Sequence, residues 1–165
     1  MTGGCGFIAS NFINTVSLRY PECHIVNLDK LDYCSNVYNV RPGACTFVKG
    51  DIKNRDLVTF LIEKYDFDTV FHFAAQSHVD NSFSDPVMFT YENVCGTHNL
   101  LEAFRLGKPS VEFIHFSTDE VYGTWVSGGG SGADFGHASV GEQQRVYQNV
   151  YAARGAEPWA PSDGC

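Results

Sequence analysis

The chain has 165 residues, with 11 Lys and Arg against 19 Asp and Glu, and its formal net charge is −8 at pH 7. A chain of this length can build one domain with a substantial core, and its lack of a basic run or stripe argues against a nucleic-acid or anionic-membrane surface. No apolar run approaches the roughly 18 residues of a membrane span, and no charged segment leads into an apolar stretch at the N-terminus. We therefore expect a soluble, cytoplasmic protein.

The first half of the chain alternates helix and strand patterns. Apolar residues recur at helical spacing over 7–20, and Pro21 ends that helix. The apolar runs HIVNLD (24–29) and TFVKGD (46–51) predict strands, and each ends in an acid. Helical spacing returns in RDLVTFLIEKYD (55–66). The apolar stripe predicted for the first helix comprises Phe7, Ile8, Phe12, Ile13, Val16 and Leu18.

The pattern continues with TVFHFAA (69–75) as a strand, a long helix over 86–106 that begins at Asp85-Pro86, and the strand VEFIHFS (111–117). Strands that are apolar on nearly every residue and are separated by helices predict a parallel sheet covered on both faces. We therefore predict an α/β fold, the doubly wound Rossmann domain.

Two features set the limits of this domain. Only Met1 precedes the threonine of the opening turn, so we expect the fold to lack its first strand. In the strand order 3-2-1-4-5, that loss would leave a gap between the second and fourth strands. After Thr124 the composition changes to a glycine-rich tail that contains no lysine. We predict a partial NAD-binding domain over 1–124 and an irregular tail over 125–165.

The opening MTGGCGFIAS contains the spacing Gly3-x-x-Gly6-x-x-Ala9. Glycines allow a tight turn and close backbone approach to a pyrophosphate, a small third residue allows close packing, and the helix N-terminus attracts phosphate. The same spacing also occurs in ordinary turns. Asp29 favours the dinucleotide interpretation because it ends a strand twenty residues after Ala9, where an acid can bind ribose hydroxyls and repel a 2′-phosphate. Asp51 ends the next strand.

Polar residues also follow the later strands. In HFAAQSHVDNS, Ala74 and Ala75 would let a cofactor approach the backbone, and Gln76 would face the ligand crevice. We assign His78 no catalytic role. The last strand ends in Ser117-Thr118-Asp119-Glu120, where two carboxylates beside a hydroxyl could divide acid and base roles, or could simply cap a polar strand end.

The cysteines show no metal or disulfide pattern. None forms a Cys-x-x-Cys pair, so we expect reduced thiols and no metal site. The six are Cys5, Cys23, Cys34, Cys45, Cys95 and Cys165.

Six segments, in this order, resemble the nucleotide-diphosphate-glucose 4,6-dehydratases, which are extended short-chain dehydrogenase/reductase proteins. They are TGGCGFIAS, VNLDKLDYCSN, FVKGDI, HFAAQSHVDNSF, NVCGTHNLLEA and FIHFSTDEVYG, and they span about residues 2–124. The match is nearest to the branch that acts on dTDP-glucose. The UDP-glucose branch of rhamnose biosynthesis is second.

The resemblance implies a lyase reaction. Bound NAD takes hydride from C4 of the glucose, water leaves across C5 and C6, and hydride returns to C6 to give a 4-keto-6-deoxy sugar nucleotide. By resemblance, Glu120 removes the C5 proton, Asp119 protonates the leaving hydroxyl, and Thr118 bonds the C4 oxygen. Gln76 would lie near the sugar. The NAD site would be lined by Gly3, Gly6, Phe7, Ile8, Asp29, Lys30, Asp51, Ile52, Ala74 and Ala75.

The chain departs from this family in two respects. Family members use a Tyr-x-x-x-Lys pair, and none of the eight tyrosines here has a lysine four residues on. They also carry a C-terminal substrate domain, run to about twice this length and are typically homodimers. We therefore expect an inactive fragment of a sugar-nucleotide dehydratase. A non-catalytic NAD-binding module and a fragment of a UDP-glucose enzyme are the alternatives.

Overall fold

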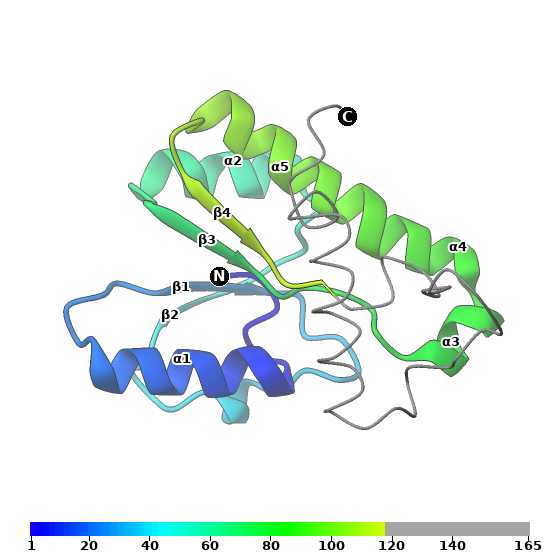
Figure 1. Ribbon diagram of the computed structural model, residues 1–165, viewed down its shortest axis with the longest axis horizontal. Helices are drawn as coiled ribbons and strands as arrows, with labels where there is room; N and C mark the ends of the chain where they lie inside the picture. The colour runs from blue at the N-terminus through cyan, green and yellow to red at the C-terminus, as the bar shows by residue number, and fades with distance from the viewer. Residues whose placement is uncertain (118–165) are drawn as a thin grey trace, which may run out of the picture. The chain divides into compact units, whose positions relative to one another are not determined.

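A computed structural model describes residues 1–117 of the chain, and Figure 1 shows its arrangement. Four short parallel strands form its sheet: β1 (Val26–Asp29), β2 (Thr46–Lys49), β3 (Thr69–His72) and β4 (Glu112–His115). Within the two pairs, Val26 lies opposite Thr46 and Val70 lies opposite Phe113. The predicted α/β class is confirmed.

Helices cover both faces of this sheet, with α1 on one face and α2 and α5 on the other (Figure 1). The long predicted helix is one continuous run in which a π-helical segment, η2, separates α4 from α5. Two short helices, α3 and η1, were not predicted. The bounds are α1 (Phe7–Arg19), η1 (Val37–Asn39), α2 (Arg55–Lys64), α3 (Val79–Ser84), α4 (Pro86–Phe89), η2 (Thr90–Cys95) and α5 (Gly96–Gly107).

Met1 and Thr2 lie between β1 and β3, in the position where we expected a gap. Thr2 forms parallel bridges to both Leu28 and His72. Its N–H donates to Phe71 O at 3.0 Å, while Leu28 N–H donates to Met1 O at 2.9 Å. The two residues therefore supply the carboxyl end of a central strand, and the gap is closed at that end.

The core has two parts, one on each face of the sheet. The larger packs β1 and β3 against α2 and α5, and its buried residues include Leu28, Val58, Val70, Leu100 and Phe104. The smaller lies under α1 around Ile13.

The stripe predicted for α1 is wrong in part, because Phe7, Ile8 and Leu18 are exposed. The residues that α1 buries are Ala9, Ser10 and Ile13, and the small ones allow the helix to approach the sheet closely. The prediction counted only apolar residues at helical spacing. In the structure, the buried residues at the start of the helix are small instead.

His72 is a fully buried polar residue in β3. Its Nδ1 lies 2.6 Å from Thr2 Oγ1, its Nε2 lies 2.9 Å from Thr97 Oγ1, and its ring stacks on His115. Burial, with a smaller effect from His115, lowers the pKa of His72 to about 4. The ring is therefore neutral at pH 7, with one nitrogen donating and the other accepting.

Replacing His72 with Asn should flatten the acid limb of the stability curve. The unfolded histidine titrates near 6.5 and the folded one near 4, so the unfolded state binds more protons between these values and stability falls as pH drops through that window. The wild-type chain should lose at most about 3 kcal/mol from this group. Urea unfolding of both proteins from pH 7 to 4 measures the difference, and parallel curves would contradict the assignment.

Gly3 adopts a left-handed conformation, with φ +69°, directly against the backbone that follows β3. A Cβ added there would lie 2.7 Å from Ala74 N and Ala74 Cα. Gly43 also has a positive φ, +78°, but a Cβ there would meet open space. A substitution at Gly43 would therefore test the backbone conformation alone, whereas a substitution at Gly3 would add a steric clash.

Gly3→Ala should destabilise the fold more than Gly43→Ala does. Gly43→Ala should cost about 1–2 kcal/mol, from the left-handed conformation alone. Gly3→Ala adds a clash with fixed backbone and should cost about 1–3 kcal/mol more. The free energy of unfolding in urea is the measurement. Equal losses for the two variants would show that the turn can move away from Ala74.

Candidate dinucleotide site

The opening turn, residues 3–6, lies at the carboxyl end of the sheet and is fixed by buried side chains of β1. Gly4 N–H donates to Asn27 Oδ1 at 3.0 Å, and Cys5 N–H donates to Asp29 Oδ2 at 2.8 Å. A Cβ on Gly4 would lie 2.1 Å from Asn27 Oδ1 and 2.6 Å from Ile13 Cδ1, so a larger residue here would have to displace these buried side chains. The glycine spacing predicts Gly3 and Gly6, whereas Gly4 and Asn27 lie outside that pattern.

The N-terminus of α1 follows this turn without a side-chain cap. Gly6 is the N-cap residue, it makes no capping bond, and the first turn carries no acid. Phe7 and Ile8 turn their side chains outward. The first N–H groups of a helix have no partner within the helix and carry its positive dipole end, so this terminus can receive an anion.

Asp29 ends β1 beside the turn and is almost fully buried. Its Oδ2 accepts from Cys5, and its Oδ1 accepts from the N–H of Leu31 at 2.7 Å. Each carboxylate oxygen can accept a second hydrogen bond, so Asp29 keeps acceptor capacity for a ligand hydroxyl. The structure thus places Asp29 next to the turn, as the sequence spacing predicts.

Lys30 and Lys53 meet three carboxylates at the same edge. Lys30 Nζ lies 2.8 Å from Asp32 and 2.9 Å from Glu92. Lys53 pairs with Glu92 and lies 3.5 Å from Asp51. The network links the segments that follow β1 and β2 to the π-helical segment η2.

The network fixes the charge of its members. Burial opposes ionisation of Glu92, but the bonds from Lys53 and Lys30 outweigh it and lower its pKa below the ordinary value. The bond from Lys30 lowers the pKa of Asp32, and the bond to Glu92 raises the pKa of Lys53. Glu92, Asp32 and Lys53 are therefore charged at neutral pH.

Gln76 lies at the same edge of the sheet, in the segment that follows β3. Its backbone N–H donates to Asn93 Oδ1 at 2.7 Å, and Asn93 Nδ2 donates back to Gln76 O at 2.8 Å. Its Nε2 donates to Asp32 at 2.6 Å. The residue is buried, with 6% of its surface exposed, yet its Oε1 has no hydrogen-bond partner among residues 1–117. A buried acceptor of this kind can take a donor from a bound molecule.

The remaining predicted residues lie at the same edge. Ala74 is half-buried against Gly3, and Ala75 is exposed. Asp51 accepts from the N–H of Lys53, and the side chain of Ile52 is buried in the core. Thus the structure brings the predicted turn, strand-end and post-strand residues together, although Ile52 contributes to packing through its side chain.

Thr118, Asp119 and Glu120 lie outside the described residues. The last described contact of their segment is Phe116 N–H to His72 O, at 3.0 Å, which continues the pairing of β4 with β3. Because the strands are parallel, β4 ends at the same edge as β1 and β3.

Sequence reasoning missed Asp32, Lys53, Glu92 and Asn93. Glu92 and Asn93 belong to η2, and both turn toward the strand ends. π-Helical segments within longer helices often occur at functional sites. No periodic pattern predicts such a segment, whereas the acidic and amide pair in the otherwise apolar helix TYENVC was a usable signal.

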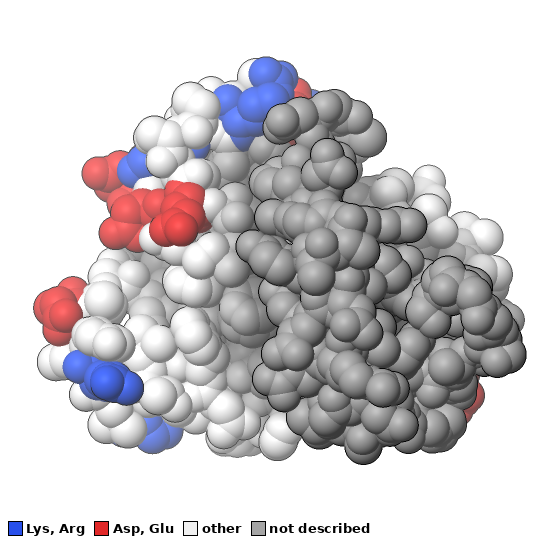
Figure 2. Space-filling model, viewed as in Figure 1, with Lys and Arg blue, Asp and Glu red and all other residues white. Residues whose placement is uncertain are grey.

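The charge distribution on the face in Figure 2 is mixed. Blue and red side chains of the described residues occur there as separate small groups. Within residues 1–117, the five cysteines are free thiols and no cluster of His, Cys, Asp and Glu could hold a metal ion. None of the described helices is long and apolar enough to cross a membrane.

A glycine turn before an uncapped helix, a buried acid ending β1 and a parallel sheet define a dinucleotide-binding domain of the Rossmann type. The family model described as GDP-mannose 4,6 dehydratase matches residues 1–129, and the chain belongs to this family.

Two relatives illustrate the family. The chain is 52% identical, over 127 residues, to an Arabidopsis thaliana trifunctional UDP-glucose 4,6-dehydratase/UDP-4-keto-6-deoxy-D-glucose 3,5-epimerase/UDP-4-keto-L-rhamnose-reductase, a match that covers 74% of this chain. It is 43% identical, over 158 residues and 93% of this chain, to dTDP-D-glucose 4,6-dehydratase of Mus musculus. The matches span 19% of the plant protein and 42% of the mouse protein.

Solved structures of the same fold include both dehydratases and epimerases. A Streptomyces venezuelae dTDP-glucose 4,6-dehydratase, crystallised with NAD and TYD, aligns with a TM-score of 0.66 and 38% identity, covering 80% of this chain and 43% of that one. A UDP-glucose 4-epimerase of Thermotoga maritima aligns with a TM-score of 0.68 and 28% identity, covering 76% and 39%.

Glu92→Gln should destabilise the fold by about 1–2 kcal/mol at pH 7, between the values for exposed and buried pairs. It leaves Lys30 and Lys53 close together without their shared partner. The folded pKa of Glu92 lies below its unfolded value, so its contribution is present above the unfolded pKa and lost as pH falls through the folded one. The variant and the wild-type chain should therefore converge in acid.

The matched control is Glu102→Gln, which breaks an exposed pair with Arg105 on α5. It should produce no resolvable change in the free energy of unfolding in urea, either at pH 7 or in acid. If the two variants behave alike at pH 7, the network around Glu92 does not hold the edge together.

Proposed function

We propose that this chain provides the NAD-binding part of a sugar-nucleotide 4,6-dehydratase. The observation that carries the proposal is the combination at one sheet edge of the uncapped α1 terminus, the buried Asp29 and the Gln76 Oε1, which has no partner within residues 1–117. Membership of the 4,6-dehydratase family and the NAD bound in a related dehydratase structure support it.

The residues present fit a dinucleotide. Gly3 packs directly against the Ala74 backbone, where a Cβ would lie 2.7 Å away, so the turn stays next to the strand end. N–H groups at Phe7 and Ile8 would hold the pyrophosphate next to Gly6, whose own N–H donates to Gly3 O at 3.2 Å, and Asp29 would accept from the adenosine ribose. Lys30, Asp51, Ile52 and Ala75 would line the remainder of the site.

Bound NAD would supply reversible hydride acceptance. The chain's own residues would orient the sugar and move protons: Gln76 and Thr118 would bond it, Glu120 would take a proton from carbon, and Asp119 would protonate the departing hydroxyl. A carboxyl pair can divide these roles when its two environments separate the pKa values. These assignments rest on the resemblance and on the end of β4 at this edge.

The substrate is a nucleotide-diphosphate glucose, with dTDP-glucose giving dTDP-4-keto-6-deoxyglucose as the leading reaction. UDP-glucose is the second candidate, supported by the 52% identity to the plant trifunctional enzyme against 43% to the mouse dTDP-glucose enzyme. We further propose that residues 1–165 alone do not turn over, because no Tyr-x-x-x-Lys pair is present. Losing a positioned base costs on the order of 10²–10⁴-fold.

The chain should bind NAD at least about tenfold more tightly than NADP, a difference of about 1.4 kcal/mol. Asp29→Asn should reduce this preference, because the amide removes the charge that repels a 2′-phosphate but keeps one acceptor oxygen for the turn. Calorimetry with both cofactors is the measurement. Asp56→Asn, which makes the same change in the exposed first turn of α2, should leave both affinities unchanged.

Two results would contradict the proposal. Absence of NAD binding up to about 1 mM, a binding free energy weaker than about 4 kcal/mol, would remove the cofactor assignment. Formation of a 4-keto product from NAD and dTDP-glucose or UDP-glucose at ordinary enzyme rates would instead show that the chain is active alone. The same assay compares the two sugar nucleotides.

A further inference from the structure

Lys30 follows Asp29 directly in the chain, so a cation stands beside the acid that the proposed function assigns to the adenosine ribose. NADP differs from NAD by a phosphate on the 2′-hydroxyl of this ribose. In dinucleotide-binding domains an acid at this position binds the free hydroxyl, whereas a nearby arginine accommodates the 2′-phosphate. Lysine also binds phosphate, as a point charge. The contacts of Lys30 therefore bear on the choice between the two cofactors.

Both ionic contacts of Lys30 are with carboxylates. Its Nζ lies 2.8 Å from Asp32 Oδ2 and 2.9 Å from Glu92 Oε2. Asp32 is two positions further along the same segment, whereas Glu92 reaches across from η2. The Lys30 side chain keeps 31% of its surface exposed, against 12% for Glu92. The lysine is thus open to a ligand, while its partner from η2 is largely enclosed by the protein.

Glu92 is held in place from two sides. Its Oε1 contacts Lys53, so the carboxylate is shared between two lysines. Burial opposes its ionisation, but the bonds from these lysines outweigh burial and lower its pKa. The next residue, Asn93, exchanges hydrogen bonds of 2.7 and 2.8 Å with the backbone of Gln76, which fixes η2 against the segment after β3. Glu92 is therefore a fixed negative charge at this edge.

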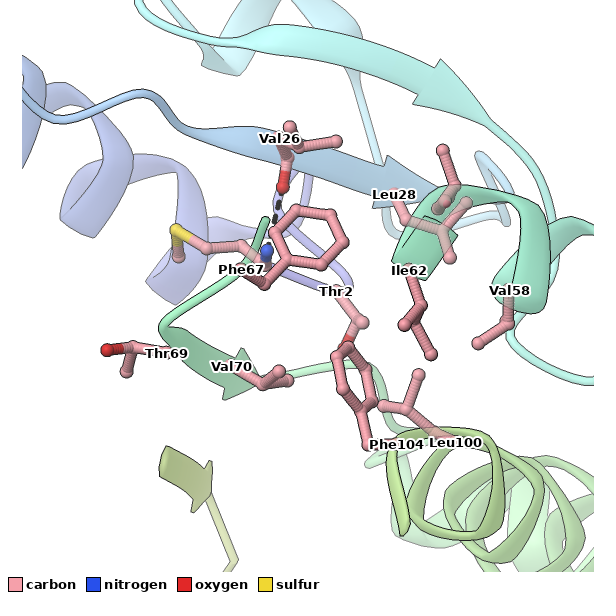
Figure 3. A pocket seen from close by; sticks show the side chains of 12 residues that line it. Thr2, Val26, Leu28, Val58, Ile62, Phe67, Thr69, Val70, Leu100 and Phe104 are labelled. Carbon is pink, nitrogen blue, oxygen red and sulfur yellow. Dashed lines mark hydrogen bonds between the residues drawn. The ribbon is translucent and has the colours of Figure 1, made fainter. Parts of the chain in front are cut away.

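A cation for the 2′-phosphate has to come from the edge itself. Beneath β1 and β3, Figure 3 shows Leu28, Val58 and Leu100 around a cavity of about 40 Å³. None of the residues that line this cavity is a lysine or an arginine. At the edge, Lys49 lies opposite Asp29 in the register of β1 and β2, and it is exposed. Lys49 is therefore the alternative to Lys30 that a test has to separate.

We infer that Glu92 is a second determinant of cofactor choice, because it keeps Lys30 paired and unavailable to the 2′-phosphate of NADP. This role rests on the proposed function and extends it from the acid of β1 to a residue of η2. A phosphate monoester carries about 1.5 to 2 negative charges at pH 7. It would meet four carboxylates here, those of Asp29, Asp32, Asp51 and Glu92. Glu92 acts through Lys30 and is a positioning residue.

The test compares the binding of NAD and NADP to the full chain and to Glu92→Gln by calorimetry. In the variant, the NADP affinity should rise about fivefold relative to the NAD affinity, because one nearby charge no longer opposes the phosphate and Lys30 can pair with it. The gain should shrink at about 0.5 M salt, where charges are screened more strongly. A variant that only loosened the fold would bind both cofactors more weakly and leave their ratio unchanged.

Three further variants support this comparison. Glu102→Gln removes the same charge from the exposed pair on α5 and should leave the ratio unchanged. Lys30→Gln, added to Glu92→Gln, should return the ratio to within about twofold of the wild-type value, whereas Lys49→Gln in the same background should keep the gain. If Glu92→Gln does not fold, Glu92→Leu takes its place, since leucine is a good helix former and also removes the charge.

An unchanged ratio in the Glu92 variants, or an equal gain in Glu102→Gln, would overturn the inference. A gain that persists without Lys30 and disappears without Lys49 would also overturn it, because a different lysine would then meet the phosphate. In each of these cases the wild-type chain still binds NAD, so the proposed function stands. A wild-type chain that does not bind NAD removes the proposed function and this role together, and the wild-type titration alone shows that result.

Discussion

The backbone of Thr2 joins the two halves of the sheet. β1 pairs with β2 and β3 pairs with β4, and the bridges from Thr2 to Leu28 and His72 connect these pairs. Its side chain adds the bond to the buried, neutral ring of His72. The glycine turn begins at the next residue, so the position of the turn relative to both β1 and β3 depends on this one connection.

That connection explains why the candidate site is assembled from distant parts of the sequence. Gly3 must contact Ala74, and Cys5 must reach Asp29, because Thr2 holds the turn between the strands that carry them. Lys30 then reaches Glu92 on η2, which closes the edge from the helical side. Burial and charge pairing act together here: the partly buried carboxylate of Glu92 stays ionised because two lysines contact it.

The sequence predicted what depends on repeating patterns. Apolar runs gave the order of the four strands, and glycine spacing with Asp29 gave the turn and its acid. The strands are shorter than the predicted runs; β3, for example, ends at His72, although the Phe73 N–H still donates to Thr2 O at 3.1 Å. The buried face of α1 was misjudged because close approach to the sheet favours small residues.

Other features depend on tertiary contacts that no local pattern encodes. Two residues, Met1 and Thr2, are too few for a strand signal, yet hydrogen bonds to both neighbours hold them in the sheet. The π-helical turn of η2 is equally invisible to a 3.6-residue period, although it places Glu92 and Asn93 at the site.

The fold by itself does not select the reaction. Dehydratase and epimerase structures resemble this domain about equally, with TM-scores of 0.66 and 0.68, so the sheet and its glycine turn serve both chemistries. Abstraction at C5 and departure of the C6 hydroxyl need an acid and a base that an epimerase does not. The residues that would supply them, Asp119 and Glu120, come after β4 in the sequence and lie outside the described residues. The proposed lyase activity therefore depends on a few side chains after one strand, whereas the proposed NAD binding depends on the connection through Thr2.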